Sequence, residues 1–230
     1  MSETIQTAIP EFQTSVEAPN PHAAIEGLNL ASDPAVRTSQ LAQNTTGEGL
    51  LQAAILLHTT LAPEVVHTPS NVARTIADPV SGEVSAVLMK PEERLPFLEK
   101  AATLIKQLGE SVQPGEEQAF LNRAGNITGL ALVLAHTFED GNGRTARTLA
   151  HAIRYGSEVN DHNREDFDVL SANRPTNGFK ITSYLPNNEG KSLAPVELLE
   201  AAASLDIPLT NQTAYGQIAY HNFAQPYADA

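Results

Sequence analysis

Residues 116–156 read EEQAFLNRAGNITGLALVLAHTFEDGNGRTARTLAHAIRYG, and this stretch decides the fold class. Apolar residues recur at helical spacing over its first half, which predicts a buried helix at 116–135. A second helical pattern runs from about residue 143 to Tyr155 and stops at Gly156. Two glycines in the intervening turn allow the backbone to adopt positive φ angles. The stretch therefore predicts two helices joined by a tight, polar loop.

The segments on either side of this stretch are also mostly helical in pattern. Apolar periodicity predicts helices at 50–61 and 91–109, and weaker ones at 163–172 and 194–203. Over residues 72–90, alternating apolar residues flank a Pro/Gly turn, which predicts a β-hairpin. We therefore expect a mainly α fold with one β-hairpin before the glycine-containing loop.

Composition suggests three parts along the chain. Residues 1–40 are rich in proline and acid and have no basic residue before Arg37, which predicts a loosely ordered acidic arm with a short helix near 23–28. Residues 41–205 carry the helical patterns and are expected to form one folded domain. Residues 206–230 are expected to be a C-terminal tail.

The net charge and the missing residue types exclude several functions. The formal charge is −13, which argues against a nucleic-acid partner because phosphate contacts need clustered Lys and Arg. The chain has no Cys, so disulfides, thiolate zinc sites and a Cys nucleophile are excluded. No apolar run is long enough to suggest a membrane span or a signal peptide. A cytoplasmic protein is expected, although an effector exported without a cleaved signal would look the same.

The loop within residues 136–147 combines several groups that act on phosphates. Backbone N–H groups at the start of the second helix would form an anion site. Arg144 and Arg147 lie three apart and would leave the helix on one face. Asp140 supplies a hard oxygen ligand of the kind that holds Mg²⁺. His136 can accept a proton near neutral pH. Together these groups favour phosphoryl or nucleotidyl transfer.

The loop resembles the signature of the Fic family, His-x-Phe-x-(Asp/Glu)-Gly-Asn-Gly-Arg-x-x-Arg. Thr137 stands where that family usually has proline. Every defined position is met, by His136, Phe138, Asp140, Gly141, Asn142, Gly143, Arg144 and Arg147.

The resemblance implies a protein adenylyltransferase, which moves AMP from ATP to a Ser, Thr or Tyr hydroxyl of a target protein. Residues 41–205 would be its catalytic domain, of the Fic/Doc type. His136 would be the general base, and Asp140 would hold Mg²⁺. The hairpin at 72–90 resembles the family's flap, which would pair with the backbone of the target. The ATP phosphates would be bound by Gly141, Asn142, Gly143, Arg144 and Arg147.

Other functions remain open on the same signature. Transfer of UMP, phosphocholine or phosphate would use a similar loop. Doc-type kinases carry Lys in place of the second glycine, so Gly143 favours AMP transfer. A non-catalytic nucleotide-binding regulator is the alternative from another class, and the intact His136 argues against it.

Glu48 is a candidate inhibitory residue. Many Fic proteins carry an inhibitory helix with the pattern (Ser/Thr)-x-x-x-Glu-(Gly/Asn), and residues 44–49 match only its Glu-Gly part. In that reading Glu48 would pair with Arg147; otherwise it is an acid at the start of a helix. A separate antitoxin could supply the inhibitory Glu instead.

Two histidines outside the signature are expected to have no role in catalysis or metal binding. His58 is predicted to border a helix core. His151 follows Arg147 by four residues and is expected on the helix surface.

Overall fold

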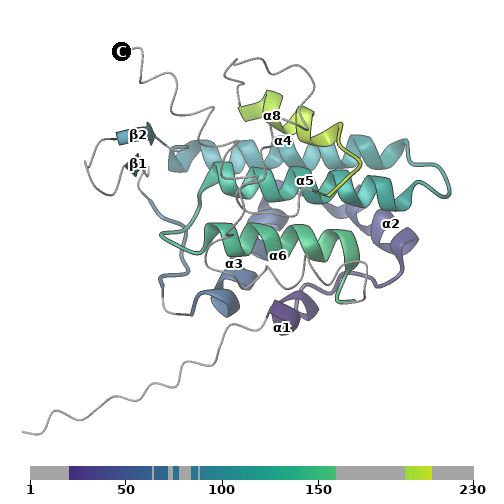
Figure 1. Ribbon diagram of the computed structural model, residues 1–230, viewed down its shortest axis with the longest axis horizontal. Coiled ribbons are helices and arrows are strands. Elements are labelled where there is room, and N and C mark those ends of the chain that lie inside the picture. Colours follow the sequence, from purple (N-terminus) through teal and green to yellow (C-terminus); the bar gives the residue numbers. More distant parts are fainter. Residues whose placement is uncertain are drawn as a thin grey trace, which may run out of the picture.

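The computed structural model describes residues 21–63, 65–71, 75–77, 84–87, 89–158 and 195–208. Helices dominate this part of the chain (Figure 1), which confirms the prediction of a mainly α protein. The helices are α1 (Pro21–Glu26), α2 (Pro34–Asn44), α3 (Gly47–Leu61), α4 (Pro91–Glu110), α5 (Glu117–Ala135), α6 (Asn142–Tyr155) and α8 (Pro195–Ala203).

Most of the helices begin and end at signals visible in the sequence. α4 opens with Pro91 in its first turn, and the carboxylate of Glu93 accepts the N–H of Lys90 at 3.0 Å. α6 ends at Gly156, whose φ of 66° is a conformation that glycine adopts without strain. The helices predicted at 50–61, 91–109, 116–135, 143–155 and 194–203 are therefore confirmed, while the one predicted at 163–172 lies outside the described residues.

The expected start of the folded domain at residue 41 is wrong, because it falls inside α2. Asp33 caps this helix by accepting the N–H of Val36 at 2.9 Å, and Pro34 occupies the first turn. α2 packs against α4 and α5. Residues 21–40 therefore belong to the folded part, and the acidic, proline-rich composition reflected caps and turns there. Residues 1–20 lie outside the described part.

Arg37 of α2 links the segment before α2 to the end of α6. Its side chain is 2% exposed and donates to the backbone carbonyls of Ser32 at 2.8 Å, Ile153 at 3.0 Å and Arg154 at 3.0 Å. It also donates to the carbonyl of Ala31. Burial lowers the pKa of Arg37 from its ordinary value. The guanidinium thus satisfies carbonyls at the end of α6 and in the segment before α2.

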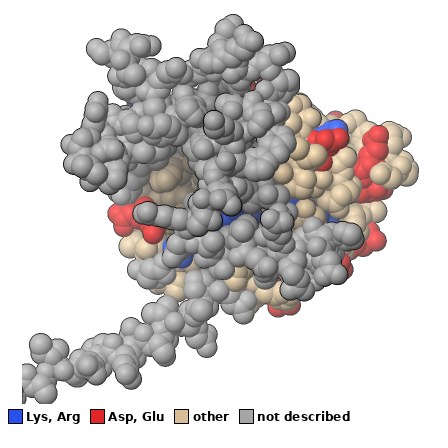
Figure 2. Space-filling view, viewed as in Figure 1, with Lys and Arg blue, Asp and Glu red and all other residues tan. Residues whose placement is uncertain are grey.

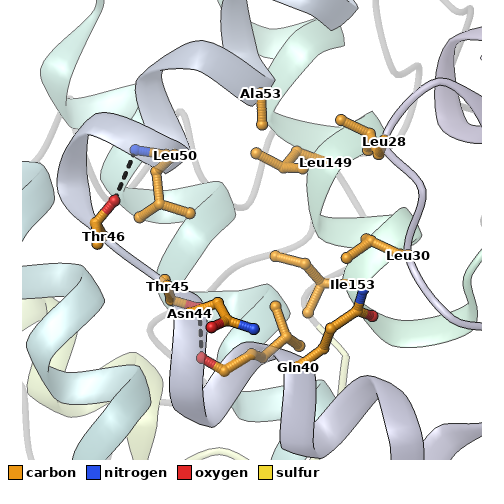
Figure 3. A pocket seen from close by; sticks show the side chains of 12 residues that line it. Leu28, Leu30, Gln40, Asn44, Thr45, Thr46, Leu50, Ala53, Leu149 and Ile153 are labelled. Carbon is orange, nitrogen blue, oxygen red and sulfur yellow. Dashed lines mark hydrogen bonds between the residues drawn. The ribbon is translucent and has the colours of Figure 1, made fainter.

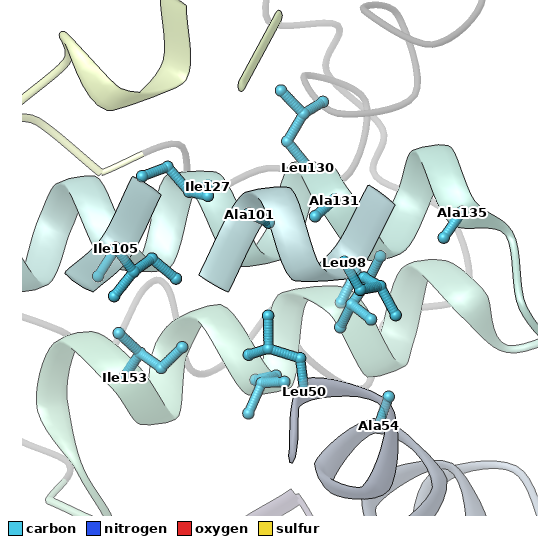
Figure 4. Close-up of a cluster of buried hydrophobic side chains, with 14 of the residues drawn as sticks. Leu50, Ala54, Leu98, Ala101, Ile105, Ile127, Leu130, Ala131, Ala135 and Ile153 are labelled. Atoms are coloured by element: carbon cyan, nitrogen blue, oxygen red, sulfur yellow. The ribbon is translucent and has the colours of Figure 1, made fainter. Parts of the chain in front are cut away.

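The core is centred on α5. α4, α5 and α6 run side by side (Figure 1), and α8 covers α4 and α5. Aliphatic side chains from these helices and from α3 interdigitate in one cluster (Figure 4), which includes Leu50, Leu98, Ala101, Ile105, Ile127, Leu130, Ala131 and Ile153. The loop of residues 136–147 therefore connects two helices that pack directly against each other in the core.

Two short strands lie at one edge of the molecule, just before α4 (Figure 1). β1 (Thr75–Ala77) pairs antiparallel with β2 (Val84–Val87), and Ile76 lies opposite Ala86. The register is irregular between Ile76 and Ala77. The remainder of the segment expected to form a hairpin, except Met89 and Lys90, lies outside the described residues.

No described helix has both the length and the apolar character needed to cross a membrane.

In the space-filling view, acidic side chains gather along the right-hand margin and few basic ones reach the visible surface (Figure 2).

Candidate functional site

His136 ends α5 in a left-handed backbone conformation, with φ 43° and ψ 57°. Its N–H donates to the carbonyl of Leu132 at 3.1 Å, which closes the last helical turn. A non-glycine residue in this conformation is strained by about 1–2 kcal/mol, so the surrounding structure must hold it there. The reversal turns the chain sharply out of α5 and places half-buried His136 at the start of the loop.

Asn142 closes the loop from within. Its amide oxygen accepts the N–H of Phe138 at 2.8 Å, and its amide nitrogen donates to the carbonyl of Phe138 at 2.8 Å. The residue is only 7% exposed. Because both functions of the side-chain amide are used, the backbone N–H is the group of Asn142 that remains for a phosphate.

The start of α6 forms an anion-binding cradle. Gly141 caps the helix with φ 76°, and its carbonyl accepts the first helical bond from Thr145 at 3.0 Å. Among the described residues, no acceptor is found for the N–H groups of Gly141, Asn142 and Gly143. Unpaired N–H groups at a helix N-terminus attract phosphate and carboxylate groups. The structure thus brings together the three residues predicted to bind phosphate through their backbone.

Arg144 and Arg147 lie one turn apart on α6, as predicted. Arg144 donates to the carbonyl of Leu61 at 2.9 Å, which anchors it to the end of α3. Arg147 is 4% exposed, and burial, followed by the neighbouring charge of Arg144, lowers its pKa to about 10. The Arg147 guanidinium therefore stays protonated at neutral pH.

Asp140 presents its carboxylate to solvent beside this cradle. The side chain is 76% exposed, and one oxygen lies 3.9 Å from a guanidinium nitrogen of Arg144. Within the described part of the chain, no three His or acidic residues cluster as a metal cage. Mg²⁺ usually binds one or two carboxylates together with substrate phosphates and water, so a single exposed carboxylate next to an anion site fits that ion.

His58 of α3 packs directly against the loop, a contact that the sequence does not predict. The ring is fully buried and stacks on Phe138, with centroids 3.9 Å apart and planes at 14°. Its Nε2 lies 2.8 Å from the carbonyl oxygen of Asp140, and its Nδ1 lies 3.1 Å from Nδ1 of His67. Burial lowers the pKa of His58, and the hydrogen bond to the Asp140 carbonyl opposes this shift. These partners are up to 82 residues apart, so no local pattern could reveal them.

The segment 65–71 lies along the same loop. The N–H of Ser70 donates to the carbonyl of Thr137 at 2.8 Å, and the buried guanidinium of Arg94 donates to the carbonyl of Ser70. Thr137 therefore uses its backbone oxygen here, a group that proline would supply equally well. Its departure from the family pattern removes none of these contacts.

Glu48 lies in the first turn of α3, away from the loop. It is ten residues before His58, which corresponds to roughly 15 Å along the helix axis. Glu48 is exposed, and no ion pair of this residue is found within the described part of the protein. The structure therefore does not bring Glu48 and Arg147 together.

Replacing Glu48 with Gln is accordingly expected to change protein labelling from ATP by less than about twofold. The helix loses only a favourable charge at its N-terminus, worth about 0.3–1 kcal/mol. Labelling assays and thermal unfolding on the native protein and Glu48→Gln measure both effects. A severalfold rise in labelling would show that Glu48 does inhibit, through a conformation other than this one.

A cavity of about 230 Å³ lies between α2, α3 and α6, at the end of α3 opposite His58. Aliphatic side chains make up most of its wall (Figure 3), and none of the signature residues contributes. Such a lining does not suit nucleotide phosphates. The residues around it are Leu28, Leu30, Gln40, Leu41, Asn44, Thr45, Thr46, Gly49, Leu50, Ala53, Leu149 and Ile153.

The expectation that His151 lies on the helix surface is wrong, since it is 1% exposed. α6 is covered on nearly all sides, and the His151 ring packs edge-on against Tyr155 with centroids 5.0 Å apart. Burial, followed by the charge of Arg154, lowers the pKa of His151 to about 4.

The burial of His151 is expected to make the protein less stable in acid. Its folded pKa of about 4 lies below the ordinary value of 6.5, so the unfolded state binds a proton first as the pH falls. The neutral ring stabilises the fold fully above pH 6.5, and up to about 3 kcal/mol is lost as the pH falls toward 4. Urea unfolding of the native protein and His151→Leu at about pH 7 and about pH 4 measures this. Equal acid sensitivity of the two proteins would contradict it.

Comparison with protein-family models and with curated protein sequences finds no match to this chain. The site is therefore assigned from the signature residues and from the geometry of the α5–α6 connection.

Proposed function

We propose that this protein is a Fic-type protein adenylyltransferase, which transfers AMP from Mg-ATP to a hydroxyl group of a target protein. One observation carries the proposal. A single short turn holds His136, the exposed carboxylate of Asp140 and the N–H groups that begin α6, for which the described residues offer no acceptor. A base, a metal ligand and an anion cradle at that spacing are the parts that nucleotidyl transfer requires.

In the proposed reaction, His136 accepts the proton of the target hydroxyl. The hydroxyl oxygen then forms a bond to the α-phosphorus of ATP, and the bond from that phosphorus to the α–β bridging oxygen breaks. Pyrophosphate leaves, and AMP remains on the protein as a phosphodiester. A positioned base of this kind contributes about 10²–10⁴-fold to the rate.

The charges around the cradle suit the leaving pyrophosphate. Asp140 would hold Mg²⁺, which neutralises part of the phosphate charge when bound. Arg144 lies in the first turn of α6, next to the cradle, and Arg147 lies one turn further along and remains protonated at neutral pH. Arginine forks match phosphate oxygens in geometry as well as in charge. The notably buried position of Arg147 would strengthen such a contact, because water screens it less.

The paired strands β1 and β2 are proposed to act as the flap that receives the target. They precede α4, and the segment after α3 connects them to the loop through Ser70 and Thr137. An extended target segment could add to a free strand edge by main-chain hydrogen bonds. Such pairing would present a hydroxyl to His136 without reading much sequence.

Labelling with ATP carrying a radioactive α-phosphate tests the transferred group. The native protein is incubated with Mg²⁺ and a cell lysate, with an excess of unlabelled ATP, UTP or CDP-choline as competitor. We expect protein-bound label that only ATP competes away. Stronger competition by UTP or CDP-choline than by ATP would instead show that this donor binds the site in preference, which favours UMP or phosphocholine as the group moved. ATP binding without any labelling would indicate a nucleotide-binding regulator.

A further inference from the structure

His58 lies at the boundary between α3 and the signature loop, and its contacts determine how one peptide of that loop is oriented. Its ring fills the space under Phe138, and its Nε2 lies 2.8 Å from the carbonyl oxygen of Asp140. A carbonyl oxygen can only accept, so Nε2 of His58 must carry the hydrogen and donate.

The second ring nitrogen of His58 is held by His67. In a neutral imidazole with hydrogen on Nε2, Nδ1 is an acceptor. Nδ1 of His67 lies 3.1 Å away, so it must donate to Nδ1 of His58. The pair therefore forms a directed chain from His67 through His58 to the Asp140 carbonyl. Half-buried His67 thus stabilises the tautomer of fully buried His58 that the Asp140 carbonyl requires.

This chain decides the direction of the next N–H group. In a trans peptide, the carbonyl of one residue and the N–H of the following residue point in opposite directions. Because His58 holds the carbonyl of Asp140 toward α3, the N–H of Gly141 points away from α3. That N–H has no acceptor among the described residues. It therefore has no competing acceptor there and can donate to a phosphate oxygen on the side of the loop away from α3.

The turn packs tightly against the end of α3. Gly141 has φ 76°, and a Cβ atom built there would lie 3.0 Å from Nε2 of His58 and 3.0 Å from Cβ of Ala62. Contacts this close mean that the imidazole edge and the last residues of α3 fit directly against the turn. Rotation of the Asp140–Gly141 peptide would turn the N–H toward α3 and break the bond to His58.

We propose that His58 is a positioning residue for nucleotide transfer, which orients the Asp140–Gly141 peptide so that the Gly141 N–H binds a phosphate oxygen of the nucleotide. The inference rests on the proposed function in its choice of nucleotide as ligand. This peptide group is bonded to the Cα atom of Asp140. Its orientation therefore also affects the direction of the Asp140 side chain, the proposed metal ligand.

Two variants separate hydrogen bonding from packing at this position. His58→Gln retains a side-chain N–H at about the reach of Nε2, and loses the ring that stacks on Phe138. His58→Phe retains a ring of similar size, and loses the donor to Asp140. If His58 only fills space, Phe will be the better replacement; if it orients the peptide, Gln will be.

We expect His58→Phe to bind Mg-ATP and Mg-pyrophosphate about 10- to 100-fold more weakly than the native protein, the loss typical of one hydrogen bond to a charged group. His58→Gln should stay within about threefold of the native affinity, even if its thermal unfolding temperature is lower. Isothermal titration calorimetry provides the affinities. The reverse order of the two variants, or equal affinity in all three proteins, would overturn the proposal.

Nitrogen NMR of the histidine rings tests the proposal without any activity. In the native protein, the His58 ring should carry hydrogen on Nε2 only, and the His67 ring should carry hydrogen on Nδ1. The Gly141 amide resonance should shift on addition of Mg-pyrophosphate in the native protein and not in His58→Phe. Hydrogen on Nδ1 of neutral His58 would exclude the assigned role. If these results hold but no AMP is transferred, the positioning role stands and the proposed function fails.

Discussion

Replacing His136 with Asn is expected to lower AMP transfer by about 10²–10⁴-fold, the usual contribution of a positioned general base. ATP binding should stay within about twofold, because none of the groups proposed to hold the phosphates belongs to this side chain. Asn is the informative replacement, since it tolerates the left-handed conformation that residue 136 adopts. Single-turnover labelling gives the rate, and calorimetry gives the ATP affinity.

His136→Ala provides the matched comparison. Alanine also lacks a base, but it is strained at φ 43°, so part of its effect will come from the backbone. We expect both variants to lose transfer and Ala to lose stability in addition. Transfer at more than about one tenth of the native rate by His136→Asn would show that another group accepts the proton.

Replacing Arg37 with Met is expected to destabilise the protein by about 3–5 kcal/mol, because several buried carbonyls lose their donor and each unsatisfied one costs about 1–3 kcal/mol. The side chain donates to four carbonyls, those of Ala31, Ser32, Ile153 and Arg154. Methionine fills similar space but leaves these oxygens without their donor. Urea unfolding with linear extrapolation measures the change.

Two controls sharpen this prediction. Lys100→Met removes an exposed cation from α4 and should change stability by less than about 0.5 kcal/mol. Arg37→Lys keeps the charge but lacks the planar guanidinium that donates to several carbonyls at once. Its free energy of unfolding should therefore be well below that of the native protein. If Arg37→Met loses less than about 1 kcal/mol, water or other donors must satisfy the carbonyls, and Arg37 does not hold these segments together.

Helix positions were predictable because their signals are local. The apolar periodicity of α5, the proline that opens α4 and the glycine that ends α6 act within a few residues of each boundary. Local signals are insufficient for α2, because the proline-rich, acidic composition before residue 41 predicts a loose arm. There Asp33 and Pro34 form a helix start, and Arg37 supplies the tertiary contacts that make the helix stable.

The sequence identifies the residues of the candidate loop, but it does not reveal which side chains pack against that loop and hold it in place. The signature placed His136, Asp140 and the start of α6 in one turn, because these residues are consecutive in the chain. The stacking of His58 on Phe138 depends on how α3 packs against α6, which no local pattern contains. The same applies to His151, whose environment depends on the helices that surround α6. Sequence spacing identifies reactive groups, whereas packing determines their orientation.

The most direct measurement compares two forms of labelled ATP on the native protein. In parallel reactions with Mg²⁺ and a cell lysate, one sample receives ATP labelled at the α-phosphate and the other receives ATP labelled at the γ-phosphate. An adenylyltransferase leaves protein-bound label from the α-labelled ATP only, and loses it in His136→Asn. Label from the γ-labelled ATP would show phosphate transfer, and would contradict the assignment of AMP as the group moved.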